Sequence, residues 1–400
     1  MDENKRKSIL EIFEEKKLVT VCAPMVRYSK IQFRTLVREY NCDVCYTPMI
    51  LADSFCRSEK ARNNEFATTS SDFPLIVQFA AKTVHDFVGA SYMVSPYCSG
   101  VDLNCGCPQT WAKQMGIGCA MLNNPELISD IVKQCRNQIS KPFTVSAKLR
   151  VLKDIRKTVE IARCLEKAGI SFLAVHARTP SQHDKNVDVN GLKLVVENVN
   201  CPVIGNGGVK NFSDCLKLQE DTNAKGIMAA SGILTNPSLF AGTSFTLLEC
   251  IQKWLNICYN STLDNYSISK TRWNIPEQPL NLTFQCFHHH LVFMLEKVLT
   301  RNKRRIFNSL QNFRDVLLFL DENLGLTPQP YTYDIFKERK ILYGSYTSKD
   351  DVYQKFKSLY NVKEAKSNFV EYNYDDSEGK FFKTKLKEDE SDFGLGSMFI

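Results

Sequence analysis

The chain has 400 residues, of which 44% are hydrophobic and 24% charged, and its formal net charge is +7. The length suits one large domain of about 250 residues with an appendage, and the composition excludes a disordered or membrane-embedded class for most of the chain. Residues 1–10 are rich in charge and lack an apolar stretch, so we expect no secretory signal. No apolar run is long enough to span a membrane.

Fifteen cysteines are scattered along the chain without a regular spacing. An odd number without an export signal predicts reduced thiols, in the cytoplasm or also in the nucleus. The pair Cys42/Cys45 and the pair Cys105/Cys107 raise the question of zinc, but no second ligand pair at finger-like spacing follows. The run 288–290 of three histidines is a weak metal signal as well, because consecutive helical residues point in different directions. We therefore expect no metal.

Short apolar runs rich in β-branched residues recur eight times, as in strands that are covered on both faces. The intervals are helix-like; in 154–168 apolar residues keep helical spacing and Gly169 follows as a stop signal. A closed (β/α)8 TIM barrel and a doubly wound open sheet both suit this alternation. The absence of G-x-G-x-x-G after the first run, and the polar residues that end nearly every run, favour the barrel. The runs cover 18–25, 42–48, 74–80, 100–106, 143–150, 172–179, 202–209 and 224–231.

The remaining sequence predicts a small all-α domain and a charged tail. Apolar residues at helical spacing from Phe284 to Val298 and from Ile306 to Leu320 predict two packed helices. Residues 284–314 contain six Lys or Arg and one acid, a balance that suits a phosphate backbone. We divide the chain into an N-terminal extension (1–17), the barrel (18–250), a linker rich in Asn, Ser and Thr (251–283), the helical domain (284–344) and a charged, partly disordered tail (345–400).

The fourth run ends in Asn104-Cys105-Gly106-Cys107-Pro108, which places a thiol and a carboxamide on a tight turn. A thiol with a pKa of about 8.5 is mostly protonated near neutral pH, so Cys107 is a candidate general acid. The alternative is that Cys107 is one more small buried hydrophobic residue, as most cysteines are.

Two neighbouring runs end in cationic or hydrogen-bonding residues. Lys148 and Arg150 end the fifth run, and His176 and Arg178 end the sixth. Strand alternation places the members of each pair on one side of their strand, so the four groups converge at the barrel mouth. A single such residue is more often a solvated ion-pair partner, but four at adjacent strand ends favour a functional site.

Glycine-containing turns follow the last two runs, where barrels commonly bind phosphate. They are Asn206-Gly207-Gly208 and Ala230-Ser231-Gly232, and Asn236-Pro237 then predicts the start of a helix. Ordinary turn glycines are the alternative. With Lys148 to balance the charge of a reduced ring, these turns suggest an FMN site. Gln78 could bind the amide edge of the flavin, and Pro24-Met25-Val26 could supply backbone groups and an apolar wall.

From about Val19 to about Leu320, the chain resembles the tRNA-dihydrouridine synthases. The resemblance rests on Ala23-Pro24-Met25, Tyr46-Thr47-Pro48-Met49, Gln78-Phe79, residues 102–108, Lys148, residues 175–180 and Asn206-Gly207-Gly208. Residues 46–51 and 287–295 are most similar to the eukaryotic subgroup that acts on positions 20a and 20b of the D-loop.

The resemblance implies roles for individual residues. Cys107 would be the general acid, Asn104 and Arg178, with Arg150, would contact the uracil or its nucleotide, and Lys148 and His176 would lie against FMN. NADPH or NADH would reduce FMN, hydride would pass to uracil C6, and Cys107 would protonate C5. The helical domain would bind tRNA, and we expect a monomer.

One position departs from the family, which usually has Arg at the phosphate turn where this chain has Ser231. Loss of a charge-assisted contact of about 1.5–3 kcal/mol would weaken the grip on FMN. Two alternatives therefore stay open: an FMN barrel that acts on a free pyrimidine, as dihydroorotate dehydrogenases do, and a non-catalytic tRNA-binding protein that has lost its flavin. The basic helical segment argues against the first.

Overall fold

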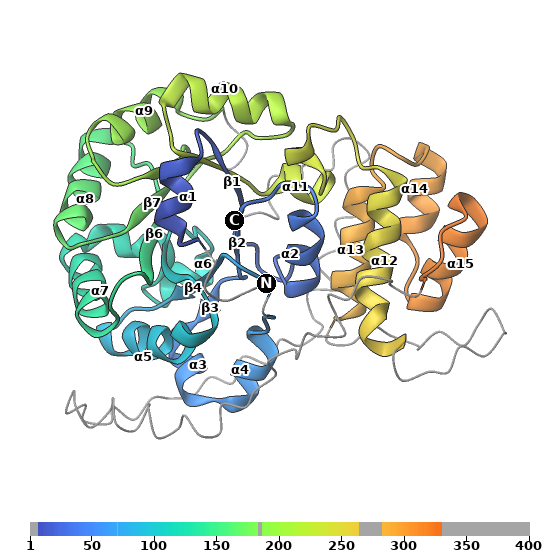
Figure 1. The fold of residues 1–400 in the computed structure, drawn as a ribbon, viewed down its shortest axis with the longest axis horizontal. Helices are drawn as coiled ribbons and strands as arrows, with labels where there is room; N and C mark the ends of the chain where they lie inside the picture. Colours follow the sequence, from blue (N-terminus) through green and yellow to red (C-terminus); the bar gives the residue numbers. More distant parts are fainter. Residues whose placement is uncertain (1–6, 70, 183–185, 264–281, 330–400) are drawn as a thin grey trace.

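The computed structural model describes residues 7–69, 71–182, 186–263 and 282–329. Within them, parallel strands form a closed barrel, in which β1 pairs with β9 and β2 with β4 (Figure 1). This confirms the predicted TIM barrel, and each of the eight predicted runs contains one strand. The barrel strands are β1 (Val19–Cys22), β2 (Val44–Tyr46), β4 (Leu75–Ala80), β5 (Gly100–Cys105), β6 (Thr144–Arg150), β7 (Phe172–His176), β8 (Val203–Asn206) and β9 (Gly226–Ala229). A two-residue strand, β3 (Ile50–Leu51), pairs in parallel with the end of β4.

Helices surround the barrel because each strand is buried on both faces and each intervening segment has one apolar stripe. The predicted helix 154–168 is confirmed as α8 (Ile155–Lys167): the side chain of Asp154 accepts the N–H of Arg156, and Gly169 follows with φ +89°. The other helices of the barrel are α2 (Ile31–Arg38), α3 (Ala52–Arg57), α4 (Glu59–Glu65), α5 (Val84–Val94), α6 (Thr110–Gln114), α7 (Pro125–Gln138), α9 (Val189–Glu197), α10 (Phe212–Thr222) and α11 (Ser231–Thr235).

A buried ion pair fastens α2 to the loop before β4. Arg34 Nη2 lies 2.6 Å from Asp72 Oδ2, and both side chains are buried. Arg38 binds the other carboxylate oxygen, with Nη2 at 3.2 Å from Oδ1. Two guanidinium groups thus satisfy one buried carboxylate.

The N-terminal extension contains α1 (Ile9–Glu15), which covers the N-terminal end of the barrel (Figure 1). Ser8 and Glu11 form a capping box at its start. Ile9 and Phe13 are buried, and the Phe13 ring lies 5.4 Å from that of Phe172, the first residue of β7.

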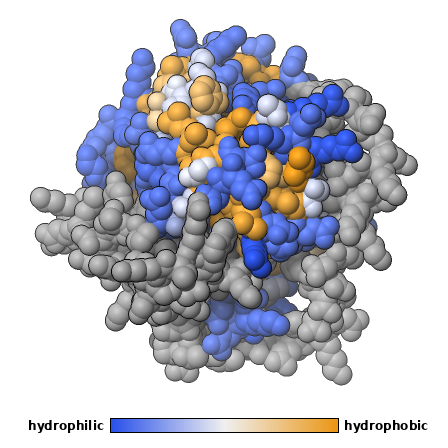
Figure 2. Space-filling view, turned by 90° about the vertical axis from the view of Figure 1, so that its right-hand side faces the viewer, coloured by the Kyte–Doolittle hydropathy of each residue, from blue (hydrophilic) through white to orange (hydrophobic). Residues whose placement is uncertain are grey.

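A group of helices stands beside the barrel: α12 (Leu248–Leu263), α13 (Phe284–Met294), α14 (Arg301–Asn308) and α15 (Phe313–Leu324). Figure 1 shows them on the side of α2, and α12 packs against α2. Figure 2 faces this side of the molecule, where hydrophilic residues surround an apolar area.

Three local expectations were wrong. The predicted linker 251–283 begins as helix α12, because Ile251, Trp254 and Leu255 are buried at helical spacing. The second predicted helix of the α domain is divided, because the Asn312 side chain accepts the N–H of Asp315 at 2.9 Å and starts α15. Ile306 consequently remains 55% exposed.

The third wrong expectation was that Asn236 starts a helix. Asn236 follows α11, and only a 3-10 turn at Leu239–Ala241 comes after it. Residues 264–281 of the predicted linker, the end of the predicted helical domain and the predicted tail lie outside the described residues. The proposed domain boundaries stay predictions.

Candidate active site

The turn that carries Cys107 follows β5 and is held from two sides. Asn104 Oδ1 accepts the backbone N–H groups of Gly106 at 3.2 Å and of Cys107 at 3.0 Å. From the other side, the N–H of Cys119 donates to the Cys107 carbonyl at 2.9 Å. Gly118 allows this approach, since a Cβ there would lie 2.5 Å from that carbonyl oxygen and its φ is +64°.

The Asn104 side chain belongs to a buried hydrogen-bond network. Asn104 Nδ2 donates to Gln78 Oε1 at 2.9 Å, and Gln78 Nε2 donates to Asp102 Oδ2 at 2.8 Å. The hydroxyl of Ser146 donates to Asp102 Oδ1 at 2.7 Å. The side-chain oxygen of Asn104 must accept, because backbone N–H groups can only donate. The side-chain nitrogen of Gln78 must donate, because a carboxylate can only accept. Both requirements lead to the same orientation of the two side-chain amides. No residue within the described ranges accepts the second N–H of either amide nitrogen, so both can donate to a ligand.

Asp102, like Ser146, belongs to this network and was given no role from the sequence. Burial raises its pKa to about 6, although the hydrogen bonds from Gln78 and Ser146 and the charge of Lys148 oppose the rise. In the sequence, Asp102 is recognisable as an acidic residue within the apolar run 100–105. Strand alternation places it on the same side of the strand as Asn104.

Lys148 is partly buried and makes no hydrogen bond or ion pair with any residue that the structure describes. Burial lowers its pKa to about 8, and the charge of Arg150 lowers it further, while Asp102 and Cys107 act in the opposite direction. A cation without a protein partner, beside a carboxylate network, is available to an anionic ligand.

Arg150 is buried, and its Nε donates to the carbonyl of Gly106 at 2.8 Å. Burial lowers its pKa to about 10. Arg150 therefore supports the Cys107 turn from β6, and the expected contact with substrate stays a prediction.

His176 and Arg178 lie together at the end of β7, with His176 Nε2 3.3 Å from Arg178 Nη1. Burial, together with the charges of Lys148, Arg150 and Arg178, lowers the pKa of His176 well below its usual value. His176 is therefore neutral at physiological pH. Strand pairing places it level with Arg150 on β6 and with Asn206 on β8.

The first glycine turn lies beside His176, and the second lies beside the residues that follow the first. Gly207 has φ +121°, and a Cβ on it would lie 3.0 Å from His176 Cδ2. Gly208 has φ +75° and is exposed. A Cβ on Gly232, in the first turn of α11, would lie 2.3 Å from the carbonyl of Val209. Such backbone cradles leave N–H groups open to a phosphate.

Three further predicted residues complete this end of the barrel. Asn206 Nδ2 donates to the Met228 carbonyl at 2.9 Å and so joins β8 to β9. Ala230 precedes α11, and Ser231 is its first residue, with no side chain capping the helix. The cradle therefore fits a phosphate through backbone groups, and Ser231 adds no charge to it.

The loop after β1 contains Pro24, Met25 and Val26. Met25 is buried and its carbonyl accepts the N–H groups of Tyr28 and Ser29, at 3.0 and 3.1 Å. Val26 is 41% exposed. The structure thus places the predicted residues in the C-terminal halves of strands or in the loops that follow them, at one end of the barrel.

Cys107 itself packs with Ala80, Ala112 and Ile117 and is 7% exposed. Burial raises the pKa of its thiol and the neighbouring Cys119 raises it further, whereas the Gln109 backbone, Arg150 and Lys148 act against this. The thiol is therefore protonated at neutral pH, as a proton donor must be.

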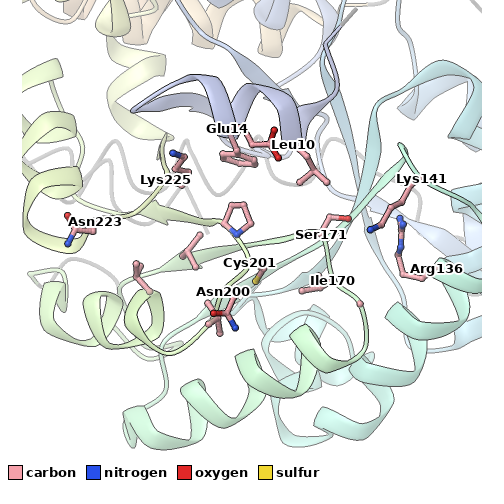
Figure 3. Close-up of a pocket in the computed structure, with 16 residues that line it drawn as sticks. Leu10, Glu14, Arg136, Lys141, Ile170, Ser171, Asn200, Cys201, Asn223 and Lys225 are labelled. Carbon is pink, nitrogen blue, oxygen red and sulfur yellow. The ribbon is translucent and has the colours of Figure 1, made fainter.

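A cavity of about 700 Å³ lies at the opposite end of the barrel (Figure 3). Residues at the starts of β7, β8 and β9 line it, together with Leu10, Phe13 and Glu14 of α1. It is not part of the site, because the candidate residues lie at the other ends of these strands. Among the described residues, no cluster of side chains could hold a metal ion and no helix could cross a membrane.

A parallel barrel that brings a protonated thiol, two oriented amides and an available lysine together is typical of enzymes that reduce or oxidise an organic ring. The family model "Dihydrouridine synthase (Dus)" matches residues 21–314. The chain belongs to the dihydrouridine synthase family and is an oxidoreductase, which confirms the predicted resemblance.

Individual relatives agree. The mouse "tRNA-dihydrouridine(20a/20b) synthase [NAD(P)+]-like" protein is 41% identical over 324 residues, which are 81% of this chain and 94% of the mouse protein. The human protein of the same description is 41% identical over 325 residues, 81% of this chain and 96% of its own length. The fission yeast (Schizosaccharomyces pombe) "tRNA-dihydrouridine(20a/20b) synthase [NAD(P)+]" is 37% identical over 316 residues, 79% of this chain and 90% of its own length.

Proposed function

We propose that this enzyme reduces the C5–C6 bond of uridine at positions 20a and 20b of the tRNA D-loop, with FMN as bound cofactor and NADPH or NADH as electron donor. The observation that carries the proposal is the Cys107 turn, which is fixed by Asn104 and lies near the charge of Lys148. The descriptions of the mouse, human and fission yeast relatives support the position and the nicotinamide donor.

Bound FMN would supply the hydride for uracil C6. Gly207, Gly208 and the backbone at the start of α11 would hold its phosphate, and Lys148 would balance charge on the reduced ring. Gln78, whose amide orientation is fixed by Asp102 and Asn104, would offer its remaining N–H to the flavin's amide edge. His176 and the 24–26 loop would complete the walls.

Cys107 would give its thiol proton to uracil C5, and Arg178 and the free N–H of Asn104 would orient the base. The target base must leave its stack to reach the barrel mouth, which costs a few kcal/mol that contacts elsewhere on the RNA offset. The exposed side chains of Arg301, Lys303 and Arg305 on α14 would supply phosphate contacts.

The full-length protein, incubated with NADPH and unmodified tRNA, tests the proposal directly. We expect a yellow protein that forms dihydrouridine at 20a and 20b and leaves orotate and free uridine unchanged. A colourless protein that binds tRNA would favour the non-catalytic alternative, and turnover of orotate would favour the free-pyrimidine enzyme. Lys303→Ala should weaken tRNA binding and reduce the slope of log affinity against log salt by about 1.

The proposal extends to compartment and assembly. All fifteen cysteines are free, which supports a reducing compartment, the cytoplasm or also the nucleus. We propose a monomer, and light scattering of the purified protein would reveal a larger assembly.

A further inference from the structure

The three consecutive histidines of α13 bind to two different parts of the molecule. His289 Nδ1 lies 3.0 Å from the Tyr28 hydroxyl, and His290 Nε2 lies 3.1 Å from the Tyr28 carbonyl. His288 Nε2 lies 2.9 Å from the carbonyl of Phe307 in α14. Consecutive helical residues project in different directions, so one short run reaches a barrel loop and a neighbouring helix together.

On the barrel side, the histidines hold the loop after β1. The N–H of Tyr28 donates to the carbonyl of Met25 at 3.0 Å, and Met25 lies in the proposed flavin wall. The Tyr28 ring packs edge-on against His290, with centroids 5.4 Å apart. One turn earlier on α13, Cys286 Sγ donates to the carbonyl of Arg27 at 2.9 Å, where the backbone has φ +71°.

On the other side, His288 holds α14. Its ring lies 5.0 Å from that of Phe307, which is fully buried. Phe307 is on the same helix as the exposed cations Arg301, Lys303 and Arg305. His288 therefore contacts the helix that carries these cations.

These histidines do not change charge in the physiological range. Burial lowers the pKa of His289 to about 4, with smaller effects from His288 and Arg27 in the same direction. Burial lowers the pKa of His290 to about 3, although the hydrogen bond with the Tyr28 carbonyl opposes this. Burial also lowers the pKa of His288. Neutral imidazoles keep the same hydrogen bonds across this pH range.

We propose that Tyr28 and His288–His290, which we call the histidine link, fix the position of the RNA-binding helix α14 relative to the barrel mouth and so select which uridine reaches Cys107. These are positioning residues, and the inference rests on the proposed function. An RNA that is bound at α14 presents one particular nucleotide at the barrel mouth only if the distance between α14 and the mouth is constant. A loosened link would leave RNA affinity intact and spread the reaction over neighbouring uridines.

Three variants of the full-length enzyme test the histidine link. Tyr28→Phe and His289→Phe each remove the hydrogen bond between these two side chains and keep an aromatic ring in place. His289→Asn is the matched control, because its side-chain amide can place a polar atom near the position of Nδ1. Thermal unfolding shows that each variant is folded; if His289→Phe is not, Tyr28→Phe, which deletes a single oxygen atom, decides.

Four measurements are made on each variant: the rate of NADPH oxidation without RNA, the dissociation constant for tRNA, the turnover number, and the distribution of dihydrouridine over the D-loop. For both Phe variants we expect the first two to stay within about twofold of wild type and turnover to fall about five- to tenfold, the effect of one lost hydrogen bond. The share of product at uridines next to 20a and 20b should rise. His289→Asn should recover most of the turnover and the wild-type distribution.

Other results would overturn the inference. Wild-type turnover and distribution in both Phe variants would show that the link selects nothing. A loss of tRNA affinity in parallel with turnover, at an unchanged distribution, would show that the histidines only stabilise the helical domain. If the wild-type enzyme forms no dihydrouridine, the proposed function fails and the inference fails with it. If the wild-type enzyme is active and only the variants behave as in the two cases above, the inference alone fails.

Discussion

Asn104 and Cys107 are joined by a hydrogen bond in which the side-chain oxygen of Asn104 accepts the Cys107 N–H at 3.0 Å. The same oxygen accepts the Gly106 N–H, and the amide nitrogen of Asn104 donates to Gln78. The position of the thiol is therefore set by a side chain that Asp102 and Gln78 orient from the barrel interior. Catalytic groups that are held in this way need no rearrangement when substrate binds.

Replacement of Cys107 by Ala should remove the proton donor and leave the reduction of flavin by NADPH unchanged. General acids typically contribute about 10²–10⁴-fold, so dihydrouridine formation should fall by a factor in that range. The measurement is single-turnover reaction of the reduced enzyme with tRNA. Cys119→Ala is the control, because its thiol is adjacent and its backbone N–H, which holds the turn, is retained. Wild-type rates with Cys107→Ala would show that another group donates the proton.

The affinity of the flavin-free protein for reduced FMN, whose ring is anionic, should depend on pH through Lys148. The pKa of Lys148 is lowered to about 8, so its charge is lost above that pH, whereas an anionic ligand favours the charged form. Affinity should therefore be constant from about pH 7 to 7.5 and fall above pH 8 by up to about tenfold per unit. Fluorescence titration measures it. The Lys148→Met variant should bind reduced FMN more weakly at pH 7, and its affinity should not decline near pH 8. If the affinity still declines in this variant, another group causes the pH dependence.

Ser231→Arg should strengthen FMN binding, since it adds a cation at the turn that we propose for the phosphate. Ser231 is the first residue of α11 and is partly exposed, so a longer side chain can extend towards solvent. A charge-assisted hydrogen bond of about 1.5–3 kcal/mol corresponds to a tighter dissociation constant by roughly 10- to 150-fold. Ser231→Gln supplies a long neutral side chain as control. Equal affinities of the Arg and Gln variants would argue against a phosphate at this turn.

Asp72→Asn should destabilise the fold by about 3–5 kcal/mol at pH 7, because it leaves Arg34 buried beside a neutral group. Burial alone would raise the pKa of Asp72, but Arg34 and Arg38 lower it below its usual value. The pair's contribution to stability is therefore present above the unfolded-state pKa of about 4 and is lost as the pH falls through the lower folded-state value. Urea unfolding between pH 3 and 7 measures both effects.

Asp154→Asn is the matched control for Asp72→Asn. Asp154 pairs with Arg156 on the surface, and asparagine caps a helix about as well as aspartate does. Its free energy of unfolding should change by at most about 1 kcal/mol. A similar small change at Asp72 would mean that water or local rearrangement satisfies Arg34.

The barrel could be predicted because its signal is local. Each strand is a short apolar run, and Gly169 and Asp154 mark the ends of α8 in the sequence itself. The α12 helix could not be predicted over its full length. Its later residues are polar, and its apolar stripe becomes meaningful only when α2 is present to cover it. Ile306 and Asn312 show the reverse case, in which a cap interrupts an apolar pattern that looked continuous.

Much of the candidate site was also predictable, because strand alternation and the rules for barrels place Lys148, His176 and Gly207 at one end. The roles of side chains that bind other strands, loops or helices of the protein could not be predicted. Asp102 orients Gln78 through a contact between two strands, and Arg150 binds a carbonyl of the Cys107 turn. His289 and His290 of α13 find their partner far along the chain, at Tyr28, which no local pattern reveals.

Helix α1 is part of the folded barrel domain, so this domain begins before β1. A chain shortened to start at Leu18 would retain every strand, yet it would uncover Phe172 and other residues that Ile9 and Phe13 shield from water. The first turn of that helix also depends on the capping box of Ser8 and Glu11. For expression, or for transfer of this barrel into a fusion protein, the N-terminal boundary is therefore at about residue 7, and a partner attached there sits at the end of the barrel away from the RNA.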